Sequence, residues 1–124
     1  MSPSTILAIH AVIALSFAVP MLLRPSFTSG QYGLSDDASS RYLARLLGAA
    51  FLAFAVIAWM ARTSTDVAAL SAICAGFTIG SAAGLLASLK GQLGGSLKPA
   101  GWSIVLIYAF LTLGYGSAWM GLSR

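Results

Sequence analysis

The chain has few charged residues, and acidic ones are the scarcest. Asp and Glu together number three of 124 residues, Lys and Arg number seven, and charged residues make up 8% of the chain. A soluble globular domain has about a quarter. The net charge of +4 is small and dispersed. No nucleic-acid partner is therefore expected, and the lipid bilayer with its anionic headgroups is the expected partner.

Side chains that carry out chemistry are equally scarce. The single cysteine, Cys74, excludes an internal disulfide and a CxxC redox pair. The three aspartates stand where helices are expected to begin, which capping explains. Neither a metal site nor paired-carboxylate catalysis is therefore predicted. Because no catalytic residue and no nucleophile–base pair at one depth can be named, an enzyme is the least favoured class.

Hydrophobic residues dominate the chain at 58%, and the mean hydropathy is +0.87. At about 20 residues per membrane span, the chain accommodates four helices and short loops. The sequence therefore predicts an all-α integral membrane protein with a single transmembrane domain over residues 1–124. The expected fold is a four-transmembrane-helix bundle of two helical hairpins, with both termini on the same side. The helices are expected at about 4–23, 36–61, 66–89 and 99–122.

Polar residues predict where these helices begin. Residues 25–35 are rich in Pro, Ser, Thr and Gly and are expected to form a loop. Ser35 is the expected cap of the second helix, and Ser64 or Thr65 is the expected cap of the third.

Basic residues are unevenly divided between the two sides of the bundle. Five accompany the loops 24–35 and 90–98, namely Arg24, Arg41, Arg45, Lys90 and Lys98. Two lie on the other side, Arg62 and Arg124. The positive-inside rule predicts a multi-pass membrane protein with both loops cytoplasmic and both termini outside. Aromatic belts are expected at the two surfaces, with Tyr32, Tyr42 and Trp102 in one and Trp59, Tyr115 and Trp119 in the other.

Small residues recur at every fourth position of the third predicted helix. They form what we call the glycine stripe, which consists of Ala72, Gly76, Gly80, Gly84 and Ser88. Residues four apart share a helix face, so the stripe predicts a smooth groove that another backbone can approach closely. The groove is expected to be the seam on which the other helices of the chain pack. The alternative is that it faces a second copy or a larger membrane complex.

His10 is the only histidine and lies about two turns inside the first predicted helix. Ser71 and Tyr115 are expected at matching depth, so a hydrogen bond from His10 to either can form the floor of a pocket. Two alternatives stay open. The histidine can serve helix packing alone, or it can ligate a haem or a chlorophyll magnesium. No cofactor is predicted.

Arg45 lies more than two turns inside the second predicted helix, with Arg41 one turn above it. Both can bind an anionic ligand or lipid phosphate, or they can extend to the cytoplasmic interface. The candidate ligand-binding residues are His10, Arg41, Arg45, Trp59, Cys74, Tyr115 and Trp119.

Two segments, Arg45–Ala49 (RLLGA) and Ala58–Arg62 (AWMAR), follow a first helix that contains a proline and a loop with Tyr-Gly-Leu. In this layout the chain resembles small bacterial four-helix membrane proteins of the DoxX-like group, most of unknown function. The resemblance implies a four-helix bundle in the bacterial inner (plasma) membrane and no catalytic residue. Through Ala44, Arg45 and Gly48 the chain also resembles membrane scaffolds of the sterol pathway, which implies a role in organising other membrane enzymes.

Three functions follow as hypotheses. The first is a scaffold or accessory subunit that acts through helix–helix contacts inside the membrane. The second is a binder or carrier of a lipid or another small hydrophobic ligand. The third is an oligomeric pore or transporter, for which several copies would be needed, and the lack of acidic residues in the spans disfavours proton coupling.

Overall fold

The computed structural model describes residues 1–95 and 97–124, and Ser96 of the predicted 90–98 loop lies outside the described residues. The described residues form the helices α1 (Pro3–Leu23), α2 (Pro25–Tyr32), α3 (Ala38–Ala61), α4 (Val67–Leu93), the short 3-10 helix η1 (Pro99–Gly101) and α5 (Trp102–Leu122). Four segments are long and apolar enough to cross a membrane. The prediction of a four-helix membrane protein is therefore confirmed.

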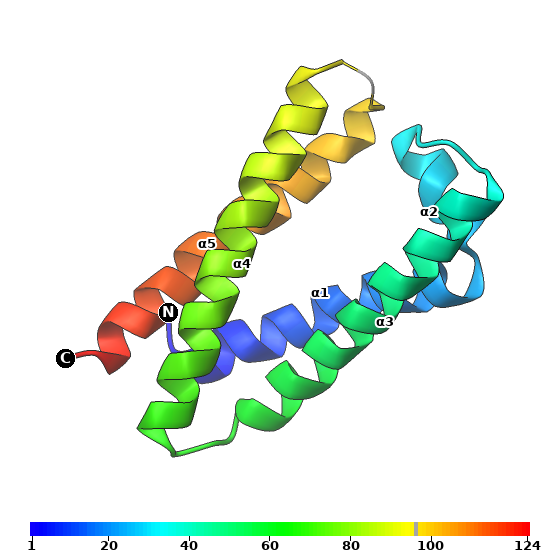
Figure 1. Ribbon diagram of the computed structural model, residues 1–124. Helices are drawn as coiled ribbons and strands as arrows, with labels where there is room; N and C mark the ends of the chain where they lie inside the picture. Colours follow the sequence, from blue (N-terminus) through cyan, green and yellow to red (C-terminus); the bar gives the residue numbers. More distant parts are fainter. Residues whose placement is uncertain (96) are drawn as a thin grey trace.

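The four long helices pack as two hairpins, α1 with α3 and α4 with α5. The hairpins meet at the end of the molecule that carries both termini and diverge toward the other end (Figure 1). At the closed end the amino group of Met1 donates a hydrogen bond to Ser117 Oγ at 3.4 Å. Two hairpins with both termini on one side are thus confirmed.

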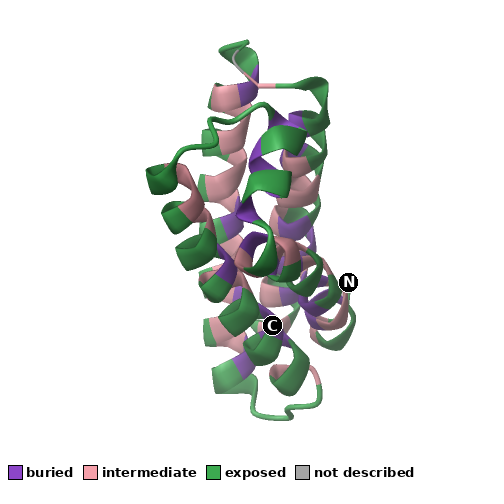
Figure 2. Ribbon diagram, turned by 90° about the vertical axis from the view of Figure 1, so that its right-hand side faces the viewer, coloured by how far each residue is buried: buried purple, intermediate pink, exposed green. Residues whose placement is uncertain are grey.

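The hydrophobic core lies where the hairpins meet. It consists of Ile6, Leu7, Ala11, Ala58, Leu70, Cys74, Leu111, Tyr115 and Ala118. Most of the outward-facing residues are exposed (Figure 2), and many of them are large and apolar. Such a surface suits a lipid environment, where large apolar side chains face hydrocarbon and not water. Long helices suit it as well, because a helix forms its backbone hydrogen bonds within one segment.

Glycines allow close contacts within each hairpin. A Cβ placed on Gly48 would lie 3.0 Å from Met21 Cβ and 3.2 Å from the Leu22 backbone nitrogen, so α1 and α3 approach closely there. In the other hairpin Gly84 lies directly beneath the ring of Tyr108. A side chain at Gly84 would require the ring of Tyr108 to shift, and one at Gly48 would require Met21 or Leu22 to give way by a few tenths of an ångström.

The glycine stripe, however, is not a continuous seam within the chain. Apart from the two chain neighbours and the nearby α4 backbone, no atom of the described residues lies within 4 Å of a Cβ built on Gly76 or Gly80. Nothing in the described chain therefore packs on Gly76 or Gly80, and Ala72 is exposed, whereas Gly84 lies against Tyr108. The helix-packing role of the stripe, Ser88 included, stays a prediction. Small residues permit close approach without enforcing it. Here Phe54 and Phe77, whose ring centroids are 5.8 Å apart, stand between α3 and α4.

The prediction of an irregular loop over residues 25–35 is wrong, because α2 occupies most of it. Its buried residues are Pro25, Thr28, Ser29 and Tyr32, which follow the i, i+3, i+4, i+7 spacing of one helix face. Proline suits the first turn of a helix, and Gly33 ends α2 in the left-handed conformation at φ 74°.

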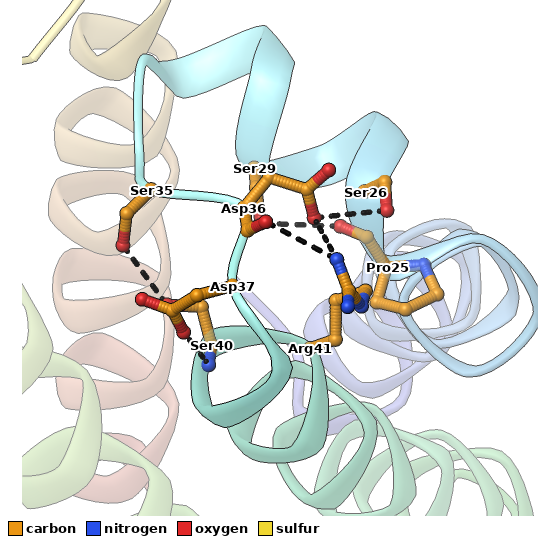
Figure 3. A network of polar contacts seen from close by, with 8 residues as sticks. All are labelled: Pro25, Ser26, Ser29, Ser35, Asp36, Asp37, Ser40 and Arg41. Atoms are coloured by element: carbon orange, nitrogen blue, oxygen red, sulfur yellow. Dashed lines mark hydrogen bonds and ion pairs between the residues drawn. The ribbon is translucent and has the colours of Figure 1, made fainter.

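Two interhelical contacts hold α2 over the open end of the molecule. The backbone N–H of Lys98 donates to the Tyr32 carbonyl at 3.1 Å, and Lys98 Nζ donates to the Gly30 carbonyl at 2.9 Å. On the other side Asp36 Oδ1 accepts a hydrogen bond from Ser26 Oγ at 2.9 Å (Figure 3). The two hairpins are thus linked at both ends.

The helix caps differ from the predicted ones. Asp37, not Ser35, caps α3, and its carboxylate accepts a hydrogen bond from the Ser40 backbone N–H at 2.7 Å (Figure 3). This bond is the main cause that lowers the pKa of the Asp37 carboxyl from its usual value. Asp66, and neither of the two residues before it, caps α4. A carboxylate combines the capping bond with the favourable helix dipole, which a hydroxyl cannot do.

Replacing Gly48 by leucine is expected to lower the free energy of unfolding by about 1–3 kcal/mol, because the side chain overpacks the contact between α1 and α3. Gly76→Leu places the same side chain in open space and is expected to change stability by less than about 1 kcal/mol. Titration with SDS in mixed micelles, followed by circular dichroism, measures both. Equal losses in the two variants would contradict the close approach at Gly48.

The side of the membrane that holds the termini is open to a direct test. A GFP fused after Arg124 is expected to be dark and an alkaline phosphatase at the same site active, because the positive-inside rule places this terminus outside. A fluorescent GFP fusion with an inactive phosphatase would reverse the orientation.

Candidate functional site: a cleft between the hairpins

A cleft of about 620 Å³ lies between the two hairpins, and we call it the interhairpin cleft. All five α-helices contribute to its walls. From α4 come the small residues Ala72, Gly76 and Gly80, which make that wall low and smooth. Apolar side chains such as Ile13, Leu47 and Ile107 line most of the remaining surface. The glycine stripe thus opens onto a cavity for most of its length.

Aromatic rings form a continuous row along the cleft. The ring centroids of Phe17 and Phe51 are 6.0 Å apart, and those of Phe51 and Phe54 are 6.2 Å apart. The row continues from Phe54 to Phe77 on α4 and from there to His10, 4.6 Å away. Most pairs meet edge to face, an arrangement that favours aromatic contact. The row joins three helices and ends at the only histidine.

His10 is hydrogen-bonded to Tyr115 at the closed end of the cleft. His10 Nδ1 and Tyr115 Oη lie 2.7 Å apart, and both side chains are buried. Of the two hydrogen bonds predicted for His10, the structure therefore contains the one to Tyr115 and not the one to Ser71. No group in the described part of the chain forms a hydrogen bond to the other ring nitrogen, Nε2, and the ring borders the cleft.

Hydroxyl groups supply the other polar atoms of the cleft. They belong to Thr28 and Tyr32 on α2, Ser81 on α4 and Tyr108 on α5. The first three of these side chains are buried. None of the described lining residues carries a net charge at neutral pH. The cleft is therefore apolar with a few neutral hydrogen-bonding groups, as small-molecule sites typically are.

The other predicted ligand-binding residues do not line the cleft. Arg41 is paired with Asp36 at 3.2 Å, and Arg45 is exposed on α3. Trp59 is exposed at the far end of α3, where the Arg62 guanidinium lies 3.5 Å from its ring centroid. Of the predicted ligand-binding residues, only His10 is among the described residues that line this cleft, and ligand binding by the others stays a prediction.

Three further predicted positions also differ in their surroundings. Cys74 is fully buried in the core, and Trp119 packs against that core. Tyr115 is fully buried, and its hydroxyl has the partner it needs in His10. Its predicted place in an interfacial belt stays a prediction.

Sequence reasoning missed the phenylalanines, which are the main feature of the cleft. Phe51 and Phe54 are three residues apart and share a face of α3, which was a usable signal. Phe17 and Phe77 could be placed opposite them only once the packing of the hairpins was known.

His10 is also the lining residue that can ligate a metal. The described residues contain no group of three His, Cys, Asp or Glu side chains that could hold an ion. Nε2 can offer one axial bond, so haem or chlorophyll ligation by His10 stays a prediction.

No protein-family model, curated protein or solved structure matches the chain. The resemblance to the DoxX-like group and to sterol-pathway scaffolds therefore stays a prediction.

Tyr115→Phe is expected to lower the free energy of unfolding by about 0.6–1.7 kcal/mol, the range found for hydrogen bonds between membrane helices. The loss leaves Nδ1 of His10 without its partner. In a His10→Phe background the same tyrosine substitution is expected to cost less, so a double-mutant cycle in mixed micelles isolates the pair. Additive effects of the two substitutions would contradict a coupled His10–Tyr115 pair.

Proposed function

We propose that this membrane protein binds a small hydrophobic molecule in the interhairpin cleft. The cleft itself carries the proposal. Its volume of about 620 Å³ falls within the range of roughly 300–1,000 Å³ that is usual for small-molecule sites. Its walls come mainly from helices that can span a membrane, so the molecules that reach it are those dissolved in the bilayer.

An apolar cleft of this size needs an occupant. Engineered apolar cavities that stay empty in proteins are nearer 150 Å³. Side chains that border a void lose their dispersion contacts on that side, and the loss grows with the volume left unfilled. Water is a poor occupant, because the lining offers few polar groups. A hydrophobic ligand restores the lost contacts.

The scaffold function has less support from the geometry. It depends on the glycine stripe, but Gly84 packs against Tyr108 of the same chain, and Gly76 and Gly80 line the cleft. The scaffold and the oligomeric pore therefore stay hypotheses that the following experiment also addresses.

The test is photolabelling of the protein in lipid nanodiscs with a diazirine-bearing long-chain alkane. Label is expected on the cleft peptides that contain Phe17, Phe51 and Phe77, above the level found on lipid-facing peptides. Gly80→Leu is expected to reduce this cleft labelling severalfold, because the added side chain occupies the cleft. The ratio of cleft to lipid-facing label, read by mass spectrometry, corrects for probe partitioning.

Gly121→Leu is the matched control, because Gly121 is exposed on α5 and no described atom lies within 4 Å of its Cβ position. This variant is expected to give the same ratio of cleft to lipid-facing label as the wild type. Equal cleft and lipid-facing labelling in the wild type would contradict the proposal. Cleft peptides that stay unlabelled in a preparation containing a stoichiometric second protein chain would contradict it too and would favour the scaffold.

A further inference from the structure

We infer that the ligand of the interhairpin cleft is an uncharged lipid alcohol whose hydroxyl group hydrogen-bonds to His10 Nε2. The inference rests on the proposed function and names the chemical class of the ligand. Three properties of the cleft carry it, namely the absence of charge among its described lining residues, the free ring nitrogen at one end and the size of the space.

The lining excludes charged ligands. It offers no arginine, lysine, aspartate or glutamate among the described residues. An ion moved from water into such a site loses its hydration and gains no counter-ion, which is strongly unfavourable. Lys98 lies at the α2 end, but its amino group is bound to the Gly30 carbonyl. Phospholipid headgroups and ionised fatty acids therefore do not suit the cleft.

The free nitrogen of His10 selects a hydroxyl group. If Tyr115 donates to Nδ1, then Nε2 carries the proton and is a donor; if Nδ1 donates to Tyr115, then Nε2 is an acceptor. A hydroxyl group both donates and accepts, so it matches either tautomer. Only 6% of His10 is exposed. Because hydrocarbon offers no hydrogen bond to a ring nitrogen at the wall of an apolar cleft, a ligand hydroxyl at this place is favoured over plain hydrocarbon.

The dimensions of the cleft bound the size of the alcohol. The volume of the cleft, about 620 Å³, lies within the range of roughly 300–1,000 Å³ of sites that hold drug-sized ligands. Along α1, the lining residues from His10 to Met21 are eleven residues apart, about 16 Å of helix. An alcohol of this size, with its tail along the row of phenylalanines and its hydroxyl at His10, fills the cleft.

The test compares three diazirine probes with the same hydrocarbon chain, a primary alcohol, the unsubstituted alkane and the permanently charged alkyl sulfate. In nanodiscs that contain the full chain, the ratio of cleft to lipid-facing label is expected to be roughly three- to tenfold higher for the alcohol than for the alkane, the factor expected of one hydrogen bond. The sulfate is expected to give the lowest ratio.

His10→Phe is expected to reduce the ratio for the alcohol to that for the alkane. Labelling by the alkane in this variant reports whether the cleft still forms, and His10→Gln, which keeps a hydrogen-bonding group, is expected to restore part of the preference. Equal cleft labelling by all three probes would overturn the inference and leave the proposed function intact. If no probe labels the cleft, both fail. An alcohol preference that survives in His10→Phe would overturn the role of His10.

Discussion

The contact between α1 and α5 at the closed end is the constraint on which the rest of the molecule depends. There the two hairpins share one small core, and the His10–Tyr115 hydrogen bond lies at its edge. In a bilayer there is little hydrophobic gain from bringing apolar helices together, so packing contacts and hydrogen bonds between helices must hold them. Because the shared core is confined to one end, the hairpins diverge toward the other, where hydrogen bonds from Lys98 to α2 link them, and the divergence creates the cleft.

The same constraint explains why the glycine stripe has two roles. Near the middle of α4, Gly84 allows the ring of Tyr108 to approach within the hairpin. Closer to the N-terminal end of α4, Gly76 and Gly80 face the neighbouring hairpin, which Phe54 and Phe77 hold at a distance. A pattern that predicts close packing therefore produces a smooth wall where bulky side chains on the opposing helix prevent the approach.

Much of the fold could be predicted from the sequence. The lengths of the hydrophobic runs predict four spans, and spans that follow one another along the chain pair as hairpins. The partner of His10 was within reach too, since counting residues from the ends of two spans places Tyr115 at its depth. The helix α2 could not be predicted from composition, because Ser, Thr and Gly favour turns. The helix forms because tertiary contacts bury one of its faces. The opposition of Phe17 and Phe51 to Phe77 depends on how the helices are rotated about their axes, which no local pattern in this chain determines.

The hydrogen bonds from Lys98 to the carbonyls of Gly30 and Tyr32, which we call the Lys98 bridge, bear on the affinity that the cleft would have for a ligand. Together with the shared core it fixes the separation of the hairpins at two points, so the cavity has its width before anything enters. A preorganised site of this kind loses little conformational entropy when a ligand binds. Selectivity would then follow from shape and from one polar contact, and the kinetics of exchange would depend on how often this bridge opens.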